Sequence, residues 1–296
     1  MEGVEPIYKG YLALGTMQVF DEHGLQYWND VWPGTTHTAH GVADIIHNVL
    51  NQMPKSAYYK RQRRYARADA GYSNPSFFNA CIAKNVGFVV RLHDNMLKPQ
   101  LGKFLTWKVQ NPNTENRIKF YDGGREAEIG ETYYRPENCA ESLRVVCLRA
   151  VKKGHEAVLF KQVQDYDYFA FITNIGAHEK SAEALIKFYR KRGNAENYIR
   201  ELKYGFDLKH YPCLKLTANK AYGLIAAFAH NLMRFLSLRE CASRPQFSKA
   251  IRFRFIHLPV QVVRHAGEVT FRFMRRHYEE VKRISAMIAD IQFGSA

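Results

Sequence analysis

The stretch "YRKRGNAENYIRELK" (residues 189–203) contains four polar residues whose spacing decides how the chain is interpreted: Tyr189, Arg192, Glu196 and Lys203. Their offsets of 0, 3, 7 and 14 positions fall on one stripe of a helix that has about 3.6 residues per turn. A first-turn glutamate with arginines four residues away also occurs on ordinary surface helices. Because a phenol and a second cation share the stripe, we expect a functional surface rather than a single surface ion pair.

The overall charge indicates the kind of partner. The 296 residues contain 43 Lys+Arg against 28 Asp+Glu, a formal charge of +15. Such an excess favours a polyanion, of which nucleic acid is the commonest. The composition, 46% hydrophobic and 14% aromatic, is that of a folded globule.

The cysteines and apolar runs bear on the location of the protein. Five cysteines without a CxxC pair suit reduced thiols in a cytosol better than disulfides or a zinc site. The start of the chain shows no secretion signal. The most apolar run, residues 221–236, contains His230, Asn231 and Arg234, so it predicts a buried helix and no membrane span. We therefore expect a soluble intracellular protein.

The order of predicted elements favours an α/β fold. A hairpin precedes an amphipathic helix, and two strands then flank a helix that begins at Ser73 or Asn74 with Pro75 in its first turn. Alternating segments with Asn-Pro, Gly-Gly and Lys-Gly turns follow, and a helical pattern runs from about Ser181 to the end, interrupted near Gly193, Pro212, Pro245 and Pro259. Asn194 can cap the helix after the first interruption, which leaves Glu196 in the first turn of that helix. The ranges are: strands 8–20, 25–32, 64–69, 86–92 and 168–174; helix from residue 42; core 1–96; β-rich insertion 97–174; second core part 175–240; helical C-terminal region 241–296.

Asp69 ends one of these strands and precedes "AGY", a turn of small residues. A carboxylate at this position lies at the mouth of the sheet, where α/β folds commonly bind their ligands. An aspartate that only forms the turn or caps a helix is the alternative.

The residues described so far resemble the signature of bacterial insertion-sequence DDE transposases: Tyr, two residues, Arg, three residues, Glu, six residues, Lys. The match falls on Tyr189, Arg192, Glu196 and Lys203. Residues 67–92 ("RADAGYSNPSFFNACIAKNVGFVVRL") are similar to the stretch around the second catalytic aspartate, which corresponds to Asp69. "WPGTTHTAHG" (32–41), with threonine at position 35 where asparagine is usual, and "YFAFITN" (168–174) also match.

The resemblance covers most of residues 8–240 and implies a ribonuclease-H-like catalytic core interrupted by the β-rich insertion. It implies cut-and-paste transposition on double-stranded DNA, both transposon ends and target, by a homodimer in a synaptic complex, in the bacterial cytoplasm at the nucleoid. By family analogy Asp69 and Glu196 each hold a divalent metal ion, Mg²⁺ or Mn²⁺. Arg192 and Lys203 then act as phosphate clamps, and Tyr189 donates to the same backbone.

These residue types suit phosphodiester chemistry. Two divalent ions about 4 Å apart supply the nucleophile, stabilise the leaving oxygen and neutralise the phosphate. Carboxylates are the hard oxygen ligands that magnesium prefers. Arginine contacts a phosphate with a bidentate fork and lysine with a point charge. Such contacts position DNA and do not read its sequence.

The family's first aspartate lies on the opening strand of the sheet, and here "MEGVEPI" (1–7) offers no strand and no aspartate. Asp21, Asp30 and Asp44 lie in the hairpin turn, on its second strand and on the first helix, so none is nominated as a replacement. We therefore expect the core to lack its first strand, and the chain to be the C-terminal part of a transposase that joins no DNA ends by itself.

Other features carry weaker hypotheses. Trp107 could stack on an extruded base, as in some relatives, but packing is favoured. For His37 and His40 local hydrogen bonding is favoured over metal binding. "KRQRR" (60–64) and the C-terminal cations suit either DNA phosphates or a solvated face; these cations are Arg252, Arg254, Arg272, Arg275 and Arg276. The amphipathic helix 278–291 suits either the core or a partner.

Two alternatives to the catalytic transposase stay open. One is a non-catalytic basic remnant that binds DNA or dimerises, and the other is a structure-specific nuclease on the same fold. Asp69→Ala and Glu196→Ala discriminate between a catalytic and a non-catalytic chain, because binding survives both changes and catalysis does not.

Overall fold

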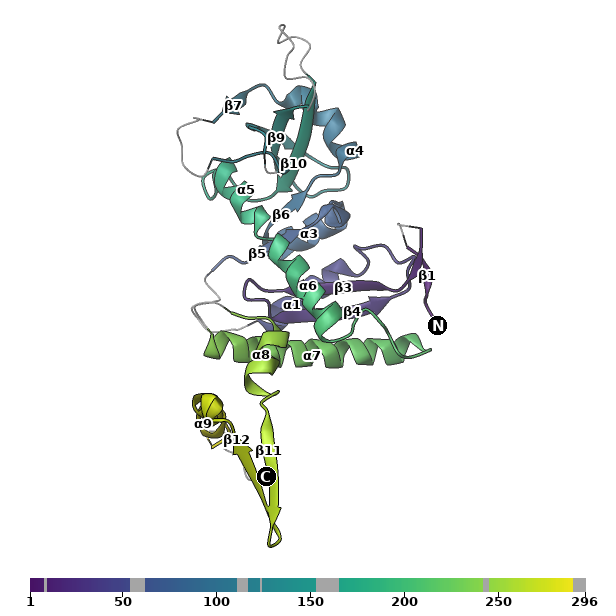
Figure 1. The fold of residues 1–296 in the computed structure, drawn as a ribbon. Helices are drawn as coiled ribbons and strands as arrows, with labels where there is room; N and C mark the ends of the chain where they lie inside the picture. Colours follow the sequence, from purple (N-terminus) through teal and green to yellow (C-terminus); the bar gives the residue numbers. More distant parts are fainter. Residues whose placement is uncertain are drawn as a thin grey trace. The chain divides into compact units, whose positions relative to one another are not determined.

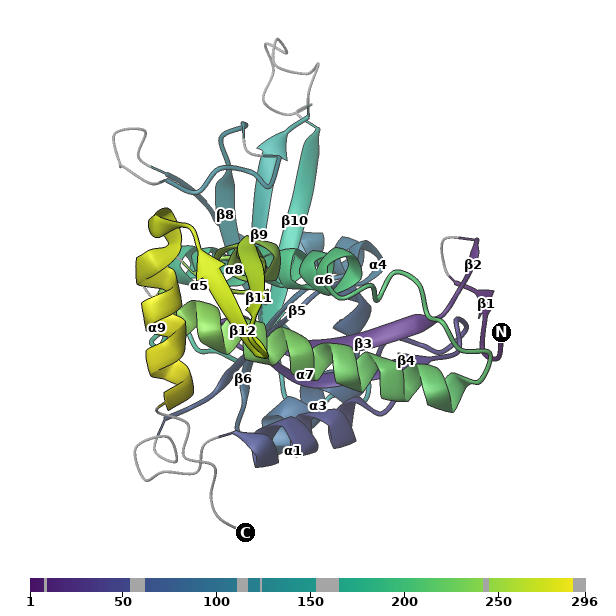
Figure 2. The same cartoon turned by 60° about the horizontal axis from the view of Figure 1, so that its bottom comes forward.

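The structure is a computed structural model that describes residues 1–7, 10–53, 62–110, 117–122, 124–152, 165–241 and 245–289. The chain divides into two compact units. The first unit contains residues 1–4, 16–32 and 197–296, and the second contains residues 5–15 and 33–196. Figures 1 and 2 show the helices and strands of both.

A six-stranded sheet forms the centre of the second unit, in the order β5-β6-β10-β9-β8-β7. β5 and β6 are parallel, and every other neighbouring pair is antiparallel. The strands are β5 (Tyr65–Ala68), β6 (Gly87–Arg91), β7 (Trp107–Val109), β8 (Glu128–Tyr134), β9 (Leu143–Val151) and β10 (Tyr166–Thr173). The strands of the predicted β-rich segment therefore continue the sheet that β5 and β6 begin.

Both faces of this sheet are covered, which explains the unbroken apolar runs of its central strands. Phe88 and Val90 of β6 point to a core shared with α1 (Val42–Gln52) and α3 (Pro75–Ala83). Val89, between them, points to the opposite core with α5 (Ala182–Arg190). Shorter elements complete the unit: β1 (Glu5–Pro6), β2 (Leu12–Ala13), η1 (Ala70–Tyr72), α4 (Asp94–Leu97) and η2 (Lys98–Lys103).

The first unit is built on the antiparallel hairpin β3–β4 and one long helix. Its elements are β3 (Gly15–Phe20, from Thr16), β4 (Gln26–Trp32), the part of α6 (Gly193–Gly205) that follows Glu196, α7 (Leu216–Glu240), α8 (Ser248–Phe255), β11 (Val260–His265), β12 (Glu268–Phe273), η4 (Arg275–His277) and α9 (Tyr278–Ala289). α7 lies against β4, since the Asn231 amide accepts from the backbone N–H of Gln26 at 2.7 Å and donates to its carbonyl at 2.8 Å. A Cβ at Gly223 would lie 2.6 Å from Asn29 Nδ2, so α7 needs glycine at this close approach.

A buried polar cluster joins α7 to the turn of this hairpin and to α6. His230 Nε2 lies 2.9 Å from the carbonyl of Gly24, and its Nδ1 lies 3.9 Å from Glu201 Oε2. Arg234 Nε donates to the carbonyl of His23 at 2.5 Å. Burial lowers the pKa of His230 despite the nearby Glu201, so the neutral imidazole is the folded form.

Several predicted elements are confirmed. β5 and β6 occupy the strands predicted at 64–69 and 86–92, and α3 begins after Asn74, whose side chain accepts from the N–H of Phe77. The prediction of no strand before Tyr8 was wrong, because Glu5–Pro6 pairs with Leu12–Ala13.

The predicted helical pattern from 241 onward was wrong for residues 260–273, which form the β11–β12 hairpin. The signal was present as alternation in "VQVVRH" and "EVTFRF" around Ala266–Gly267. Both turn residues have positive φ, 50° and 85°, as a two-residue hairpin turn requires.

The prediction that residues 221–236 form a buried helix was right about the helix and wrong about its burial. Leu224, Ile225, Phe228, Leu232 and Phe235 lie on one side of α7 and are each 54–68% exposed. Among the described residues, no helix combines the length and apolarity needed to cross a bilayer.

Candidate active site

Asp69 follows β5 directly, at the end of the strand. Its Oδ1 accepts from the N–H of Gly71 at 3.0 Å and so caps η1, while the residue as a whole is exposed. A Cβ at Gly71 would lie 3.2 Å from this oxygen, so a small residue suits the turn. Asp69 therefore does form the turn, and this hydrogen bond uses one of its carboxylate oxygens while the side chain remains exposed to solvent.

Tyr189, Arg192 and Glu196 lie around the junction of α5 and α6. α5 ends at Arg190 and α6 begins at Gly193, which confirms the predicted interruption near Gly193. The three residues therefore do not share one stripe of a single continuous helix. Arg192 Nη2 contacts Glu196 Oε1 at 2.6 Å. Glu196 is in the first turn of α6, as predicted, but Asn194 lies inside the helix instead of capping it.

Electrostatic interactions bring Asp69 into this group. Burial opposes a higher pKa for Arg192, but Tyr189, Glu196 and Asp69 outweigh it and the pKa of Arg192 is raised. The pKa of Tyr189 is raised as well, chiefly by burial and also by Asp69, against the opposing effect of Arg192. Asp69 therefore lies within electrostatic range of both side chains. Arg192 interacts with Asp69 and also forms an ion pair with Glu196.

Packing between β5 and α5 explains why residues so distant in sequence meet. Arg67 of β5 donates from Nη1 to the carbonyl of Phe188 at 3.3 Å, and its guanidinium lies 5.0 Å from the centre of the Phe188 ring. This contact fixes the end of α5 beside the strand that leads to Asp69.

Arg91 is a further cation that the sequence interpretation missed. Ala68 pairs with Val90 in the parallel β5–β6 register, so Asp69 and Arg91 follow at the same edge of the sheet. Arg91 also acts on the pKa of Tyr189. The signal was available, because a charged residue that ends the neighbouring parallel strand must lie near Asp69.

Lys203 is two turns further along α6 and is exposed. It belongs to the first unit, whereas the other four predicted site residues belong to the second. Within the second unit the structure thus brings Asp69, Tyr189, Arg192 and Glu196 together, and the proposed role of Lys203 stays a prediction.

The donor residues of the site decide whether a divalent metal ion would fit. Within the described ranges, no cluster of three or more His, Cys, Asp or Glu residues could hold a metal ion. Asp69 and Glu196 offer exposed carboxylate oxygens, the hard ligands that magnesium prefers. The two residues fit a site that takes its remaining ligands from water and phosphate. Glu196 Oε1 already contacts Arg192, so a metal ion bound to this oxygen would share it with the arginine.

The weaker candidates are mostly occupied by structural contacts. Trp107 stacks on Phe104 at 5.2 Å and lies 4.2 Å from the Arg149 guanidinium, in agreement with the favoured packing interpretation. His37 Nδ1 accepts from the N–H of Ala39, a local hydrogen bond as expected. Arg63 pairs with Glu179 at 2.6 Å.

Two of these hypotheses fall partly outside the described residues: 60–61 of "KRQRR" and 290–291 of the C-terminal helix. The C-terminal cations remain a hypothesis. Arg252 and Arg254 lie beside the rings of Phe206 and Phe255, and Arg272, Arg275 and Arg276 are exposed.

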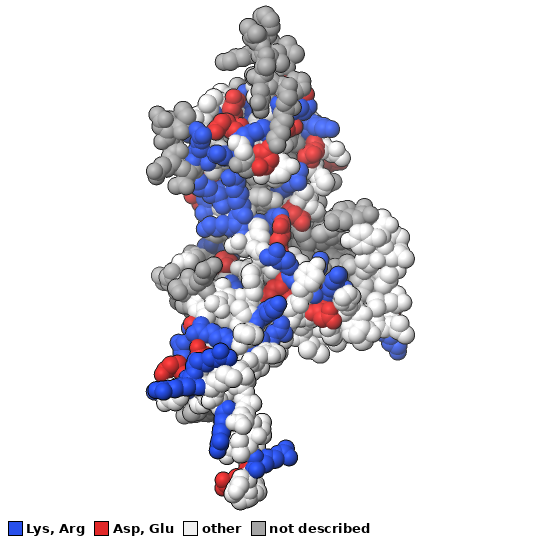
Figure 3. Space-filling view, in the orientation of Figure 1, with Lys and Arg blue, Asp and Glu red and all other residues white. Residues whose placement is uncertain are grey.

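Basic side chains gather on the second unit over the region of α5 (Figure 3). α5 carries Lys187 and Arg190 in its last turn, directly before the Arg192 junction. An exposed carboxylate at a strand end, set among arginines and a tyrosine, is an arrangement typical of enzymes that act on phosphate-bearing polymers.

Comparison with known families agrees with this class. The family described as "Transposase DDE domain group 1" matches residues 17–293. The chain therefore belongs to this family of DDE transposase domains, which gives it a transposase function in general terms, with DNA as the substrate and divalent metals as the usual cofactor. No curated protein matches the chain.

Proposed function

We propose that the chain is a cut-and-paste DDE transposase of the Tyr-Arg-Glu-Lys group, in which Asp69 and Glu196 are the metal-binding carboxylates. The observation that carries the proposal is the shared electrostatic environment of Asp69, Tyr189, Arg192 and Glu196 at the end of β5. A bound metal pair would supply an activated oxygen nucleophile and neutralise the developing charge on the phosphate.

The residues of the chain then have separate tasks. Arg192 holds Glu196 in the free protein and contacts a DNA phosphate oxygen in the complex, because its fork can serve either acceptor. Tyr189 donates its hydroxyl to the same phosphate, because a phenol is protonated at neutral pH. Lys203 contacts the backbone as a point charge.

We further propose that this sequence by itself does not complete the metal site. The family uses three carboxylates, and two are proposed here. The alternative is a basic remnant that binds DNA or dimerises without catalysis. Both readings predict DNA binding, and they differ in whether Mg²⁺ or Mn²⁺ supports any strand cleavage.

Nicking of supercoiled plasmid and binding of duplex DNA, measured on the same protein, test the proposal. The catalytic reading predicts metal-dependent nicking that Asp69→Asn and Glu196→Gln abolish while duplex binding persists. Glu137→Gln is the matched control, because Glu137 is an exposed glutamate of the same unit. Absence of nicking with retained binding supports the remnant. Joining of cut ends by the purified chain overturns the claim that the site is incomplete.

A second copy of this chain is the proposed partner in the synaptic complex. The exposed apolar side of α7 offers five large side chains. The β11–β12 hairpin, in the same unit, presents Val260, Val262, Phe271 and Phe273 on one face, since residues that pair across strands share a face. A whole aromatic side chain has an area of roughly 150–250 Å². The exposed parts of the side chains on these two faces therefore add up to an apolar area on the order of 1,000 Å². A stable interface needs about 800 Å² per partner.

Light scattering at several protein concentrations tests this interface. Wild-type protein is expected to be dimeric, and Phe228→Lys is expected to shift it to monomer, because a lysine would bring an unpaired charge into the contact. Tyr204→Lys, on an exposed aromatic of α6, is the control. A wild-type chain that stays monomeric, or a Phe228→Lys dimer of unchanged affinity, contradicts the proposal.

A further inference from the structure

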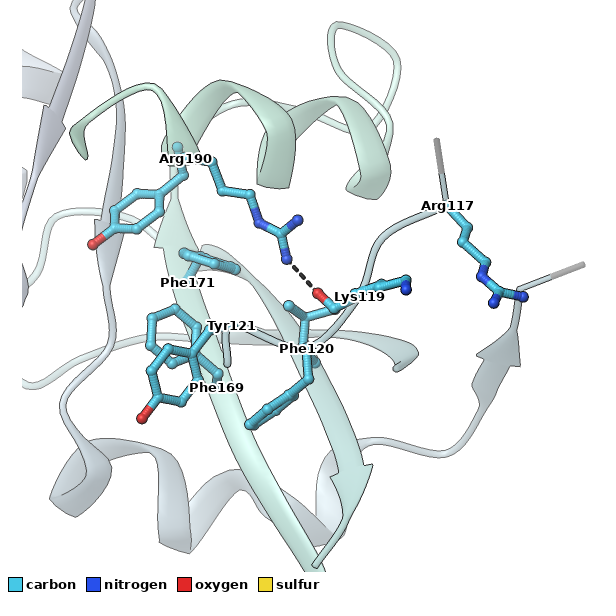
Figure 4. A pocket seen from close by; sticks show the side chains of 9 residues that line it. Arg117, Lys119, Phe120, Tyr121, Phe169, Phe171 and Arg190 are labelled. Carbon is cyan, nitrogen blue, oxygen red and sulfur yellow. Dashed lines mark hydrogen bonds between the residues drawn. The ribbon is translucent and has the colours of Figure 1, made fainter. Parts of the chain in front are cut away.

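A cavity of about 460 Å³ opens in the second unit between strands β9 and β10, the end of α5 and the segment around residue 120. Figure 4 shows the rings of Tyr121, Phe169 and Phe171 gathered on one side, with Arg190 and Lys119 beside them. The volume is within the range of about 300–1,000 Å³ that small-molecule sites occupy. We call it the aromatic cavity.

The aromatic rings form a row of ring contacts, of which the outermost pair is stacked and the inner pairs are edge-on or tilted. Phe171 packs on Tyr189 with centroids 4.6 Å apart, and Phe169 packs on Phe171 at 5.2 Å. Tyr121 stacks on Phe169 at 4.8 Å with the ring planes 23° apart. Tyr121 nevertheless stays 64% exposed, so the outer face of its ring is available to another flat group.

The cavity is also cationic. None of the described residues that line it is acidic, whereas Arg117, Lys119 and Arg190 are basic. Arg117 pairs with Glu126 at 2.7 Å. Arg190 donates to the backbone carbonyl of Lys119, a neutral acceptor. Within the part of the chain that the structure describes, no ion pair is formed by Lys119 or Arg190. The described acidic residues therefore do not neutralise these two charges.

A flat ring surface beside cations that form no ion pair with the described residues matches one ligand chemistry. A nucleotide carries an aromatic base and an anionic phosphate joined by a short spacer, and proteins bind it by stacking and by cationic contacts. An apolar ligand would leave the cations unused, and a bare phosphate would leave the Tyr121 face exposed.

We propose that the aromatic cavity binds one nucleotide, with its base on Tyr121 and its phosphate against Lys119 and Arg190. The inference rests on the proposed DNA function and deepens it. Tyr189 lines the cavity and also lies within the electrostatic group of Asp69 and Arg192. A nucleotide held here is therefore next to the phosphate that the carboxylates would face. Trp107, the residue considered from sequence, has Phe104 and Arg149 against its ring instead.

Fluorescence anisotropy with three labelled probes tests the inference on the full chain. The probes are a blunt duplex, the same duplex with one unpaired nucleotide at an end, and the same duplex with an abasic residue in that position. The unpaired nucleotide is expected to bind about 5- to 150-fold more tightly than the abasic residue, the fold-change equivalent to about 1–3 kcal/mol of stacking per base.

Variants separate the base contact from the phosphate contact. Tyr121→Ala is expected to abolish the preference for the base over the abasic residue, and Tyr121→Phe to keep it, while blunt-duplex binding is unchanged in both. Arg190→Gln is expected to weaken binding of both end-modified probes. Tyr133→Ala, at a tyrosine 60% exposed, and Lys84→Gln, at an exposed lysine, are the matched controls.

The outcomes are decisive in each arm. Equal affinity for the unpaired and abasic probes, or equal effects of Tyr121→Ala and Tyr133→Ala, overturns the inference even where the blunt duplex binds and the plasmid is nicked. A chain that binds none of the probes overturns both the inference and the DNA function. Competition by free thymidine monophosphate distinguishes the two sources of the ligand: displacement indicates a site for free nucleotides, and no displacement indicates a nucleotide within a DNA strand.

Discussion

Arg192→Gln separates the structural contribution of Arg192 from its proposed contribution to DNA binding. In the free protein this side chain pairs with Glu196 at 2.6 Å, and the two side chains are 26% and 65% exposed. An exposed pair at this spacing contributes about 0.3–0.5 kcal/mol. The ring of Tyr189, 6.0 Å away, adds on the order of 0.5 kcal/mol. The variant is therefore expected to lose less than about 1 kcal/mol of folding free energy.

The effect on DNA should be much larger. A hydrogen bond to a charged group contributes about 1.5–3 kcal/mol, or roughly 10- to 150-fold in affinity. Loss of one phosphate contact should also lower the slope of log affinity against log salt by about 0.9. The glutamine keeps a hydrogen-bond donor and removes the charge, so the salt slope reports the charge specifically.

Urea unfolding measures the free energy of unfolding, and anisotropy titrations at several NaCl concentrations, on the same preparation, measure the salt slope of the DNA affinity. Lys84→Gln, an exposed cation outside this group, should leave both near wild type. An unchanged salt slope would refute the phosphate contact. A loss of more than about 2 kcal/mol in unfolding free energy would instead make Arg192 a structural residue.

Three further predictions concern the folded state. Because burial lowers the pKa of His230, the free energy of unfolding should fall as the pH drops below the unfolded-state pKa of about 6.5 and should not depend on His230 above it. Urea unfolding should show a decline of at most about 1.4 kcal/mol per pH unit, and His230→Gln should make this decline smaller. Asn231→Ala removes both partners of the Gln26 backbone and should cost about 2–4 kcal/mol in unfolding free energy; a loss below about 0.5 kcal/mol contradicts this. Burial raises the pKa of Cys81 and Cys147 to about 12, so Ellman's reagent at pH 8 should label neither until urea unfolds the chain, and labelling of the native protein would disprove their burial.

Local sequence signals were sufficient where the structure is decided locally. Asn74 followed by Pro75 predicts the start of α3, and the cap forms with Phe77 as its donor. The apolar run at 86–92 predicts β6, because a strand with both faces covered needs no polar alternation. The positions of these elements follow from residues within one turn or one strand.

Long-range features were harder to predict. The exposure of one side of α7 could not be read from "AYGLIAAFAHNLMRFL", since an apolar helix predicts burial on all sides. The face that is buried is the one with Gly223, Ala226 and His230, the small and polar residues that fit against β4. Close packing selected small side chains for the contact and left the large ones outside. Which face of α7 is buried depends on β4, the element it packs against, and the sequence pattern of α7 alone does not contain that information.

Residues 189–203 show how a spacing and a helix break combine in three dimensions. The spacing predicts one helical stripe, whereas the predicted interruption near Gly193 divides that stripe, since α5 ends at Arg190 and α6 begins at Gly193. Tyr189, on the last turn of α5, is 8% exposed and packs on Phe171. Arg192, in the junction, turns to Glu196.

Tyr189 is the residue through which this segment serves two surfaces. Its buried ring packs on Phe171 at the aromatic cavity, and the guanidinium of Arg192 lies 6.0 Å from the same ring while it pairs with Glu196. Tyr189 is therefore part of both the aromatic cavity and the electrostatic group around Asp69. Tyr189→Ala should disturb nucleotide stacking and the carboxylate group together, whereas Tyr121→Ala should disturb only the first.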